Sequence, residues 1–313
     1  MAVPQLDAAT RLDVFLVGSG ATLTRSQAKN WIDVGRVRVN GLARKAGFLL
    51  VGGELIEIVR PAPKASIAEP EDLPLRVLYE DADMLAIDKP SGMVVHPAPG
   101  SWRGTIVNAL LHRGLVSRDA STERPGIVHR LDKETSGVLL VARHERAQLE
   151  LSRAFRDRRI HKTYLAIVLG APRNAAGSLE WPIGRHPHER QRMSIRSRAP
   201  REARTRYVVV ERFPPLSLLR LEPETGRTHQ IRVHLAAMGH PVLADALYGA
   251  RKGRALPTRG PGLGFARHAL HAAELALAHP ITGVSLHLVA PIPDDMSALL
   301  RELRRATTSE KRS

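Results

Sequence analysis

The chain has 313 residues, a length typical of about two domains. Its 43% of hydrophobic residues suffice for a folded core, which excludes a disordered chain, and the absence of cysteine excludes disulfides, iron–sulfur clusters and thiolate metal sites. With 47 basic and 31 acidic residues the net charge is +16, which predicts a polyanionic partner such as nucleic acid. A general arginine bias of the organism is the alternative explanation.

The amino-terminal residues include acidic side chains and lack the apolar segment of a secretory signal. No run of about 18 apolar residues occurs, so a membrane-spanning helix is not expected. We therefore expect a cytoplasmic protein without a membrane partner.

Residues 11–60 predict a small module of one helix and short hairpins. The helix is expected to begin at Thr24, the first residue of a capping-box pattern, and to end at Gly35. Asn40 and Gly41 are a favoured hairpin turn between two segments of alternating apolar residues. A packing appendage without a binding role is the alternative. Basic side chains suited to a phosphate backbone occur at Arg25, Lys29, Arg36, Arg38, Arg44 and Lys45.

The remainder of the chain has a mixed pattern of strands and helices. Residues 61–74 contain four prolines and no apolar periodicity, so they predict a linker. Beyond it, residues 76–96 predict two short strands, residues 137–142 a strand covered on both faces, and residues 144–159 an amphipathic helix. Residues 301–313 predict a helix end that frays into a basic tail. Because no regular βαβ order is present, an α+β class with helices packed around a sheet is expected.

One carboxylate stands out in the segment HRLD, shortly before the predicted buried strand. Asp132 lies between Arg130 and Lys133, and neighbouring cations favour the ionised form of a carboxylate. Taken alone this pattern is weak, because most aspartates beside basic residues form ordinary surface pairs.

Two further segments supply partners for such a carboxylate. In residues 226–234, Thr228 is expected to cap a helix, and Arg232 lies at the edge of its predicted buried face, where a guanidinium can hold a carboxylate. Tyr164 stands at the start of a predicted strand and combines an apolar face with a polar tip. The alternative for Tyr164 is an ordinary half-buried strand residue.

The segments HRLDKETSG, KTY and GRTHQIR together resemble the signature motifs of the RluA family of RNA pseudouridine synthases. The resemblance extends over residues 11–295, and residues 11–60 resemble the S4 RNA-binding domain. It implies an S4-like domain at 11–60, a linker at 61–74 and a catalytic domain at 75–300 with the pseudouridine synthase fold, a mixed, mainly antiparallel sheet with flanking helices. It also implies an isomerase that needs no cofactor and no metal ion.

The resemblance assigns roles to individual side chains. Asp132 corresponds to the essential aspartate, Arg232 to the arginine that pairs with it, and Tyr164 to the tyrosine that stacks on the target base. Arg130 corresponds to an arginine that fills the space left by an extruded nucleotide. Asp132 could form a covalent sugar ester or remove the C2′ proton to give a glycal, and the Tyr164 phenol could accept the C5 proton at the end.

The family members most similar to this chain modify the large ribosomal subunit, which implies uridines in the helix 69 stem-loop of 23S rRNA, free or in a large-subunit particle. Another site in 23S rRNA or tRNA is the alternative substrate, and a monomer is expected. Residues 185–206 contain eight arginines and two glutamates, and we call them the basic segment. They are expected to contact the RNA backbone, although such a run is also typical of a solvated loop.

Two other functions compete with this interpretation. The 14 histidines suggest a metal-dependent hydrolase, but His229 and His234 lie about 140° apart around a helix and cannot form an i, i+4 metal pair. His268 and His271 could share a face, yet no acidic residue recurs at ligand spacing. A non-enzymatic RNA-binding assembly factor is the second competitor, and such a factor would not need Asp132.

Overall fold

The computed structural model describes residues 1–310 except 7, 23–24, 60–67, 99, 117–125, 190 and 250–263. Contacts divide the chain into a smaller compact unit within residues 1–65 and a larger one formed by residues 66–120 and 124–313. The predicted linker at 61–74 lies partly outside the described residues, and its described part, 68–74, forms neither helix nor strand. No helix in the described ranges has the length and apolar character needed to cross a membrane.

The smaller unit packs two helices against short antiparallel strands. Its elements are β1 (Thr10–Arg11), α1 (Leu12–Gly18), α2 (Arg25–Asp33), β2 (Val37–Val39), β3 (Leu42–Ala43), β4 (Leu49–Leu50) and β5 (Ile56–Ile58). Asn40 and Gly41 both have positive φ, 50° and 74°, which confirms the predicted turn between β2 and β3. The core includes Leu12 and Trp31 from the two helices. Thr24, the predicted helix start, lies outside the described residues.

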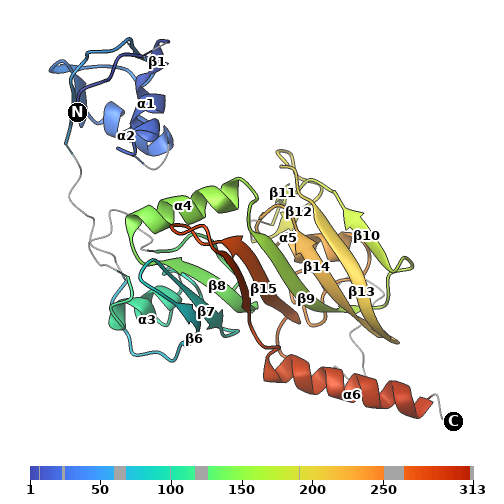
Figure 1. The fold of residues 1–313 in the computed structure, drawn as a ribbon. Helices are drawn as coiled ribbons and strands as arrows, with labels where there is room; N and C mark the ends of the chain where they lie inside the picture. The colour runs from blue at the N-terminus through green and yellow to red at the C-terminus, as the bar shows by residue number, and fades with distance from the viewer. Residues whose placement is uncertain are drawn as a thin grey trace. The chain divides into compact units, whose positions relative to one another are not determined.

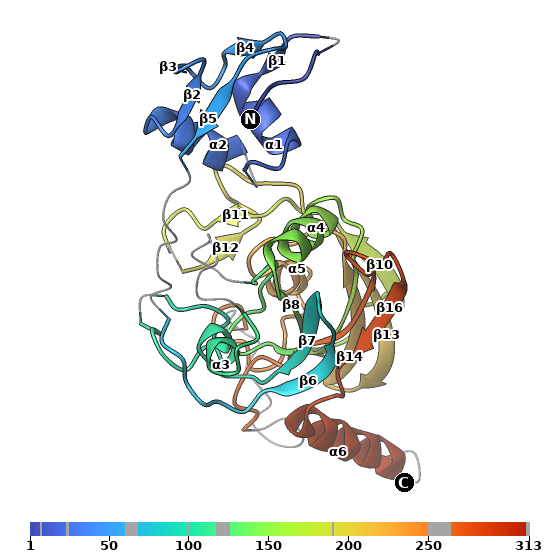
Figure 2. The same ribbon diagram turned by 60° about the vertical axis from the view of Figure 1, so that its left-hand side comes forward.

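The larger unit is an α+β domain built on one large sheet (Figures 1 and 2). Its elements are β6 (Arg76–Glu80), β7 (Met84–Lys89), α3 (Ile106–His112), β8 (Ser136–Ala142), α4 (Glu145–Arg156), β9 (His161–Leu169), β10 (Ala176–Leu179), β11 (Gly184–Arg185), β12 (Met193–Ser194), β13 (Thr205–Phe213), β14 (Leu216–Pro223), α5 (Gln230–Ala237), β15 (Leu270–Ala278), β16 (Ser285–Val289) and α6 (Asp294–Glu310). The nine-stranded sheet has the order β10-β13-β14-β9-β15-β8-β7-β6, with β16 beside β15. Of these pairings only β8–β15 is parallel, so the sheet is mixed and mainly antiparallel, as expected.

Strand β8 is buried along its whole length, as its apolar sequence predicts. Leu139 and Val141 pack on one face with residues of α3, whereas Val138 and Leu140 pack on the other face with residues of α4. Helix α4 buries its predicted apolar stripe against this strand. Because helices cover both faces here, the turn that precedes β8 is attached to a rigid part of the sheet.

Gly137 allows β8 to approach β15 closely. It has a φ of 115°, and a Cβ atom at this position would lie 2.1 Å from the carbonyl oxygen of Ala272. The first part of β15 therefore pairs with β8, and its later part pairs with β16. Thr135, at the end of the turn before β8, bonds His268, two residues before β15, through its hydroxyl at 2.8 Å. These contacts hold residues 132–135, which we call the Asp132 turn, beside β15.

Helix α6 packs its apolar side chains against one end of the sheet, where Met296, Leu299 and Leu303 join a core that includes Phe213. The helix continues to Glu310. Most of the segment predicted as a fraying tail is therefore helical, because its buried Leu303 extends the apolar stripe, and residues 311–313 lie outside the described residues.

Candidate active site

The Asp132 turn is held by two buried cations from distant parts of the chain. The Lys89 ammonium donates to the carbonyl oxygen of Lys133 at 3.0 Å and to two further carbonyls in the loop after β7. Arg267 donates to the carbonyl oxygen of Glu134 at 3.0 Å. Burial lowers the pKa of Lys89 to about 7, against the raising effect of Glu134 and Asp132. The backbone on the carboxyl side of Asp132 is thus fixed by charged donors.

Arg232, on α5, joins Asp132 to a second carboxylate. Its Nη1 donates to Asp132 Oδ2 at 2.9 Å, while Nε and Nη2 donate to the two oxygens of Asp245 at 2.7 and 2.9 Å. Burial alone would lower the pKa of Arg232, but the bonds with Asp245 and Asp132 outweigh it and raise the pKa. The guanidinium is therefore fixed between two carboxylates, and its position sets the orientation of Asp132.

Asp245 was not singled out in the sequence, although its side chain is completely buried. The signal that could have found it is an isolated aspartate within the apolar run of residues 241–248. When such a run is buried, its carboxylate must have a charged partner, and here that partner is the Arg232 guanidinium on α5.

The start of α5 differs from the prediction. The helix begins at Gln230, and His229 before it has a left-handed backbone with a φ of 55°. The expected cap, Thr228, does not fill this role. The Gln230 side chain instead accepts hydrogen bonds from the Arg227 backbone N–H at 3.0 Å and the Thr225 hydroxyl at 2.7 Å. The Gln230 backbone N–H, one of the donors that a threonine cap would bond, donates instead to the carbonyl oxygen of Arg227 at 3.0 Å.

The left-handed backbone of His229 points its side chain towards the Asp132 turn. Its Nε2 lies 3.9 Å from Asp132 Oδ1, and its Nδ1 is 2.8 Å from the Tyr248 hydroxyl. Burial lowers the pKa of His229, and the charge of Asp132 acts in the opposite direction. The Tyr248 ring also lies 5.1 Å from the Arg232 guanidinium carbon. Tyr248 therefore supports both groups that face Asp132, and the sequence reasoning missed it.

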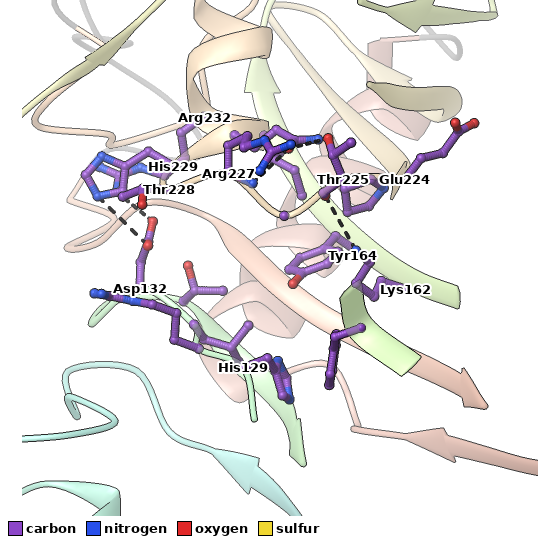
Figure 3. A pocket seen from close by; sticks show the side chains of 18 of the residues that line it. His129, Asp132, Lys162, Tyr164, Glu224, Thr225, Arg227, Thr228, His229 and Arg232 are labelled. Carbon is purple, nitrogen blue, oxygen red and sulfur yellow. Dashed lines mark hydrogen bonds and ion pairs between the residues drawn. The ribbon is translucent and has the colours of Figure 1, made fainter. Parts of the chain in front are cut away.

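Tyr164 and Asp132 line the same cavity, which has a volume of about 570 Å³ (Figure 3). Tyr164 lies in the middle of β9, opposite Leu221 of β14 and Ala272 of β15, and its side chain is half-buried. Burial raises the pKa of the phenol, and the negative charge of Asp132 raises it further. The phenol therefore stays protonated and offers its ring face to the cavity. We call this space the main cavity; its size suits a nucleoside.

Arg130 is exposed and lines both the main cavity and a second one of about 530 Å³. Asp132, His229 and Arg232 also line both cavities, so the carboxylate lies on the wall between them. The structure thus brings together Asp132, Tyr164, Arg232 and Arg130, although they come from three separate motifs.

The remaining sequence candidates belong to the smaller unit and are described within it. Arg25 donates to the buried Asp13 at 2.8 Å, and hydrogen bonds from Arg11 and Arg25 lower the pKa of that carboxyl to about 2 even though burial opposes them. Lys29 and Arg38 are exposed, and Arg36 is half-buried. Part of the Arg25 charge is therefore compensated within the unit.

The described part of the basic segment spans most of the β11–β12 hairpin, the loop after it and the first two residues of β13. Arg206 pairs with Glu224 at 2.6 Å, and Arg192 pairs with Glu189 at 2.9 Å. Arg196 and Arg198 are exposed. Acidic partners therefore offset part of the charge that the composition suggests.

One cluster in the described residues brings metal-type ligands together, at Asp81, Asp83 and His279. His279 Nδ1 accepts backbone N–H bonds from Ile281 and Thr282 at 3.3 and 3.1 Å, so its Nε2 carries the proton and donates to Asp81 at 2.9 Å. A metal ion bound between these side chains would need a lone pair on Nε2, where the proton is. The cluster is satisfied by hydrogen bonds and lines neither cavity.

The histidines of the alternative metal hypothesis also have separate hydrogen-bond partners. His268 bonds the Thr135 hydroxyl at 2.8 Å, and His271 bonds the Ser136 hydroxyl at 3.0 Å. Burial lowers the pKa of each imidazole to about 4. They support the Asp132 turn and β8 as neutral groups.

Known proteins with similar sequences match nearly the whole chain. A family model described as RNA pseudouridylate synthase matches residues 83–237, and an S4 domain model matches residues 10–56. Ribosomal large subunit pseudouridine synthase D of Xanthomonas campestris is 41% identical over 306 residues, which cover 96% of this chain and 91% of that protein. The protein of the same name from Nitrosomonas europaea is 41% identical over 305 residues, 97% of this chain and 87% of that protein. The solved structure of human RNA Pseudouridylate Synthase Domain Containing 1 has 27% identity and a TM-score of 0.56, covering 75% of this chain and 96% of that one.

Proposed function

The chain belongs to the family of RNA pseudouridine synthases, and we propose that it converts uridine to pseudouridine in the RNA of the large ribosomal subunit. The observation that carries this proposal is the carboxylate of Asp132, which Arg232 holds at 2.9 Å on the wall of a cavity shared with Tyr164. Relatives named for the large subunit match nearly their full lengths, which supports the substrate class.

Our specific proposal for the substrate is the helix 69 stem-loop of 23S rRNA, with another 23S rRNA site or a tRNA as the alternative. Residues 11–60 would bind RNA through Arg25, Lys29, Arg36 and Arg38, and residues 75–300 would carry the reaction. The net charge of +16 supports an RNA partner. We further propose that the protein acts as a monomer in the cytoplasm, where ribosomes are made.

The target nucleotide must leave its stack, because no side chain can reach the sugar carbon C1′ inside a helix. Its base would enter the main cavity and stack on Tyr164. Stacking on an aromatic ring recovers about 1–3 kcal/mol, which offsets much of the cost of extrusion. Arg130, at the mouth of the cavity, would occupy the space that the base leaves.

Asp132 would act on the sugar of the extruded nucleotide. The bond between N1 and C1′ breaks, the uracil turns over, and C5 joins C1′; C5 loses a proton and N1 gains one, so the composition is unchanged. The carboxylate either joins C1′ as an ester or takes the C2′ proton to give a glycal. In both routes it must be ionised and directed at the sugar, which is what Arg232 and Asp245 provide.

The test is a comparison of Asp132→Asn with the wild-type enzyme for conversion and for RNA binding. We expect Asp132→Asn to lose about 10²–10⁴-fold in conversion of a 23S rRNA fragment, because the amide can neither attack nor accept a proton. RNA affinity should stay close to the wild-type value. Asp294→Asn, an exposed position on α6, is the matched control and should convert normally.

Mapping of pseudouridine in total RNA, with and without the gene, identifies the sites. Loss of pseudouridine from the helix 69 loop would support the proposed substrate, and loss from tRNA alone would contradict it. A wild-type enzyme that binds RNA but converts no uridine would overturn the proposed function in favour of an assembly factor.

A further inference from the structure

Lys162 is a cation of the main cavity that the mechanism above does not use. It lies on β9 two residues before Tyr164, so both side chains project from the same face of the strand. Within the described part of the chain its Nζ donates one hydrogen bond, to the carbonyl oxygen of Thr225 at 3.5 Å. Among the described residues no carboxylate lies within 4.0 Å of it. An ammonium has three donors, so donors remain for a ligand in the cavity.

The groups around Lys162 provide little negative charge to balance its ammonium. Arg158 follows α4, and Arg227 and Glu224 come from the loop after β14; all three line the same cavity. Glu224 already pairs with Arg206 at 2.6 Å. Burial lowers the pKa of Lys162 to about 8, and the charge of Arg158 lowers it further. His129 and the apolar Leu275 of β15 complete its surroundings, and burial keeps His129 neutral by lowering its pKa to about 3.

The order of the side chains along the cavity places Lys162 at the far edge of the target base. In the view of Figure 3 the ring of Tyr164 lies between Asp132 and Lys162. A base that stacks on Tyr164, with its sugar at Asp132, points the edge opposite the sugar towards Lys162. In uracil that edge carries the carbonyl oxygens O2 and O4 and the N3–H group between them.

The chemistry of the rearrangement suits a fixed donor at this edge. When uracil turns by half a revolution about the axis through C6 and N3, C5 takes the place of N1 and O4 takes the place of O2. The edge therefore presents a carbonyl oxygen at the same position before and after the turn. A donor that bonds this oxygen can hold the base in both orientations.

We propose that Lys162 is a catalytic residue that donates a hydrogen bond to a carbonyl oxygen of the target uracil and stabilises the uracil anion formed when the N1–C1′ bond breaks. This inference rests on the proposed function. The electron pair of the broken bond stays on uracil and spreads over N1, O2 and O4. No proton moves to or from Lys162, so the proton balance of the reaction is unchanged. A preorganised positive charge in a cavity that excludes water lowers the barrier for such a charge to develop.

The first test compares Lys162→Met and Lys162→Arg under single-turnover conditions, with enzyme saturating over the 23S rRNA fragment. We expect Lys162→Met to lose about 10²–10³-fold in rate while RNA affinity stays close to wild type, and Lys162→Arg to restore part of the rate. Arg301→Met removes one exposed positive charge from α6 and should have no effect. Thermal unfolding of each variant checks that the fold is intact.

The second test uses pH, because the ammonium form is the active one. The wild-type rate should fall as the pH rises through about 8, the pKa that burial gives Lys162. Lys162→Arg should keep its rate at higher pH, since a guanidinium stays charged. If Lys162→Met does not fold, the pH profile of Lys162→Arg still decides the question. A rate that falls at the same pH in Lys162→Arg as in the wild type would overturn the proposal.

The third test changes the stability of the leaving uracil. Fluorine at C5 withdraws electrons and stabilises the anion without help from the enzyme, so Lys162→Met should slow breakage of the N1–C1′ bond less in RNA with 5-fluorouridine than in RNA with uridine. Equal losses on both substrates would show that Lys162 is only structural. A wild-type enzyme that is inactive on every RNA would refute the proposed function, whereas these outcomes concern Lys162 in an active enzyme.

Discussion

The cations around Asp132 and those of the basic segment have the same formal charge but different surroundings. Arg232 has 6% of its side chain exposed and makes three bonds to carboxylates, and Lys89 is completely buried among carbonyl oxygens. Arg196 and Arg198 are exposed. Net charge alone therefore does not distinguish a cation that holds the candidate site together from one that faces solvent, whereas burial does. The following experiments test this difference.

The largest effect is expected at Arg232. Arg232→Met leaves the buried Asp245 and the half-buried Asp132 without their cation, so unfolding free energy should fall by about 3–5 kcal/mol and conversion should be lost. Urea unfolding and single-turnover kinetics measure the two effects. The double variant Arg232→Met with Asp245→Asn should regain stability but not activity. If the double variant were no more stable than the single one, unpaired Asp245 would not explain the loss.

The buried histidines should make the unfolding free energy depend on pH in the acidic range. Burial lowers the pKa of His268 and His271 to about 4, below the value of about 6.5 in an unfolded chain. Below pH 6.5 the unfolded chain therefore binds protons that the folded chain does not. The contribution of these histidines to the unfolding free energy should stay constant above this pH and fall by on the order of a few kcal/mol between about pH 6.5 and 4. Urea unfolding across this range measures the fall.

A variant separates these histidines from the exposed ones. His271→Gln should reduce the loss of stability in acid, and His161→Gln, at an exposed position, should leave it unchanged. An equal effect of both substitutions would contradict the assignment to burial.

The Tyr164 ring should matter more than its hydroxyl. Tyr164→Ala removes the stacking surface, worth about 1–3 kcal/mol, so conversion should fall by about 5–150-fold. Tyr164→Phe should convert at close to the wild-type rate, because a phenol whose pKa is raised by burial is a poor proton acceptor. Chromatography of digested RNA gives both rates. A large loss in Tyr164→Phe would instead support the phenol as the acceptor of the C5 proton.

The smallest effect is expected in the basic segment. Replacing the exposed Arg196 and Arg198 with glutamine should weaken RNA binding and lower the slope of affinity against salt by up to about 0.9 for each lost phosphate contact. Unfolding free energy should change by less than about 0.5 kcal/mol. Arg206→Gln is the control: because Glu224 already compensates Arg206, the slope should change less. An equal change in the salt slope at all three positions would favour a long-range electrostatic attraction over direct phosphate contacts.

Local patterns predicted part of this molecule well. The apolar run of β8, the stripe of α4 and the turn at Asn40 are decided by neighbours in the sequence, and all three were confirmed. The predicted start of α5 was wrong, because His229 adopts a left-handed backbone and the Gln230 N–H bonds the Arg227 carbonyl oxygen, and no spacing rule predicts this turn. The parallel pairing of β8 with β15 joins segments far apart in the chain and could not be predicted from periodicity.

The candidate site shows the same limit. Asp132, Tyr164 and Arg232 drew attention through a family resemblance, whereas their proximity is a result of the fold. Asp245 and Lys162 were missed, because the partner of one and the cavity of the other are formed by contacts between distant segments.

The bonds that Lys89 and Arg267 make to the Asp132 turn give its two middle side chains different importance. Both cations bond carbonyl oxygens, which every amino acid possesses, so the Lys133 side chain is not needed for these bonds. The Glu134 carboxylate, in contrast, raises the pKa of Lys89 and helps to keep that ammonium charged. A library randomised at position 133 alone would thus explore new RNA preferences around an unchanged Asp132.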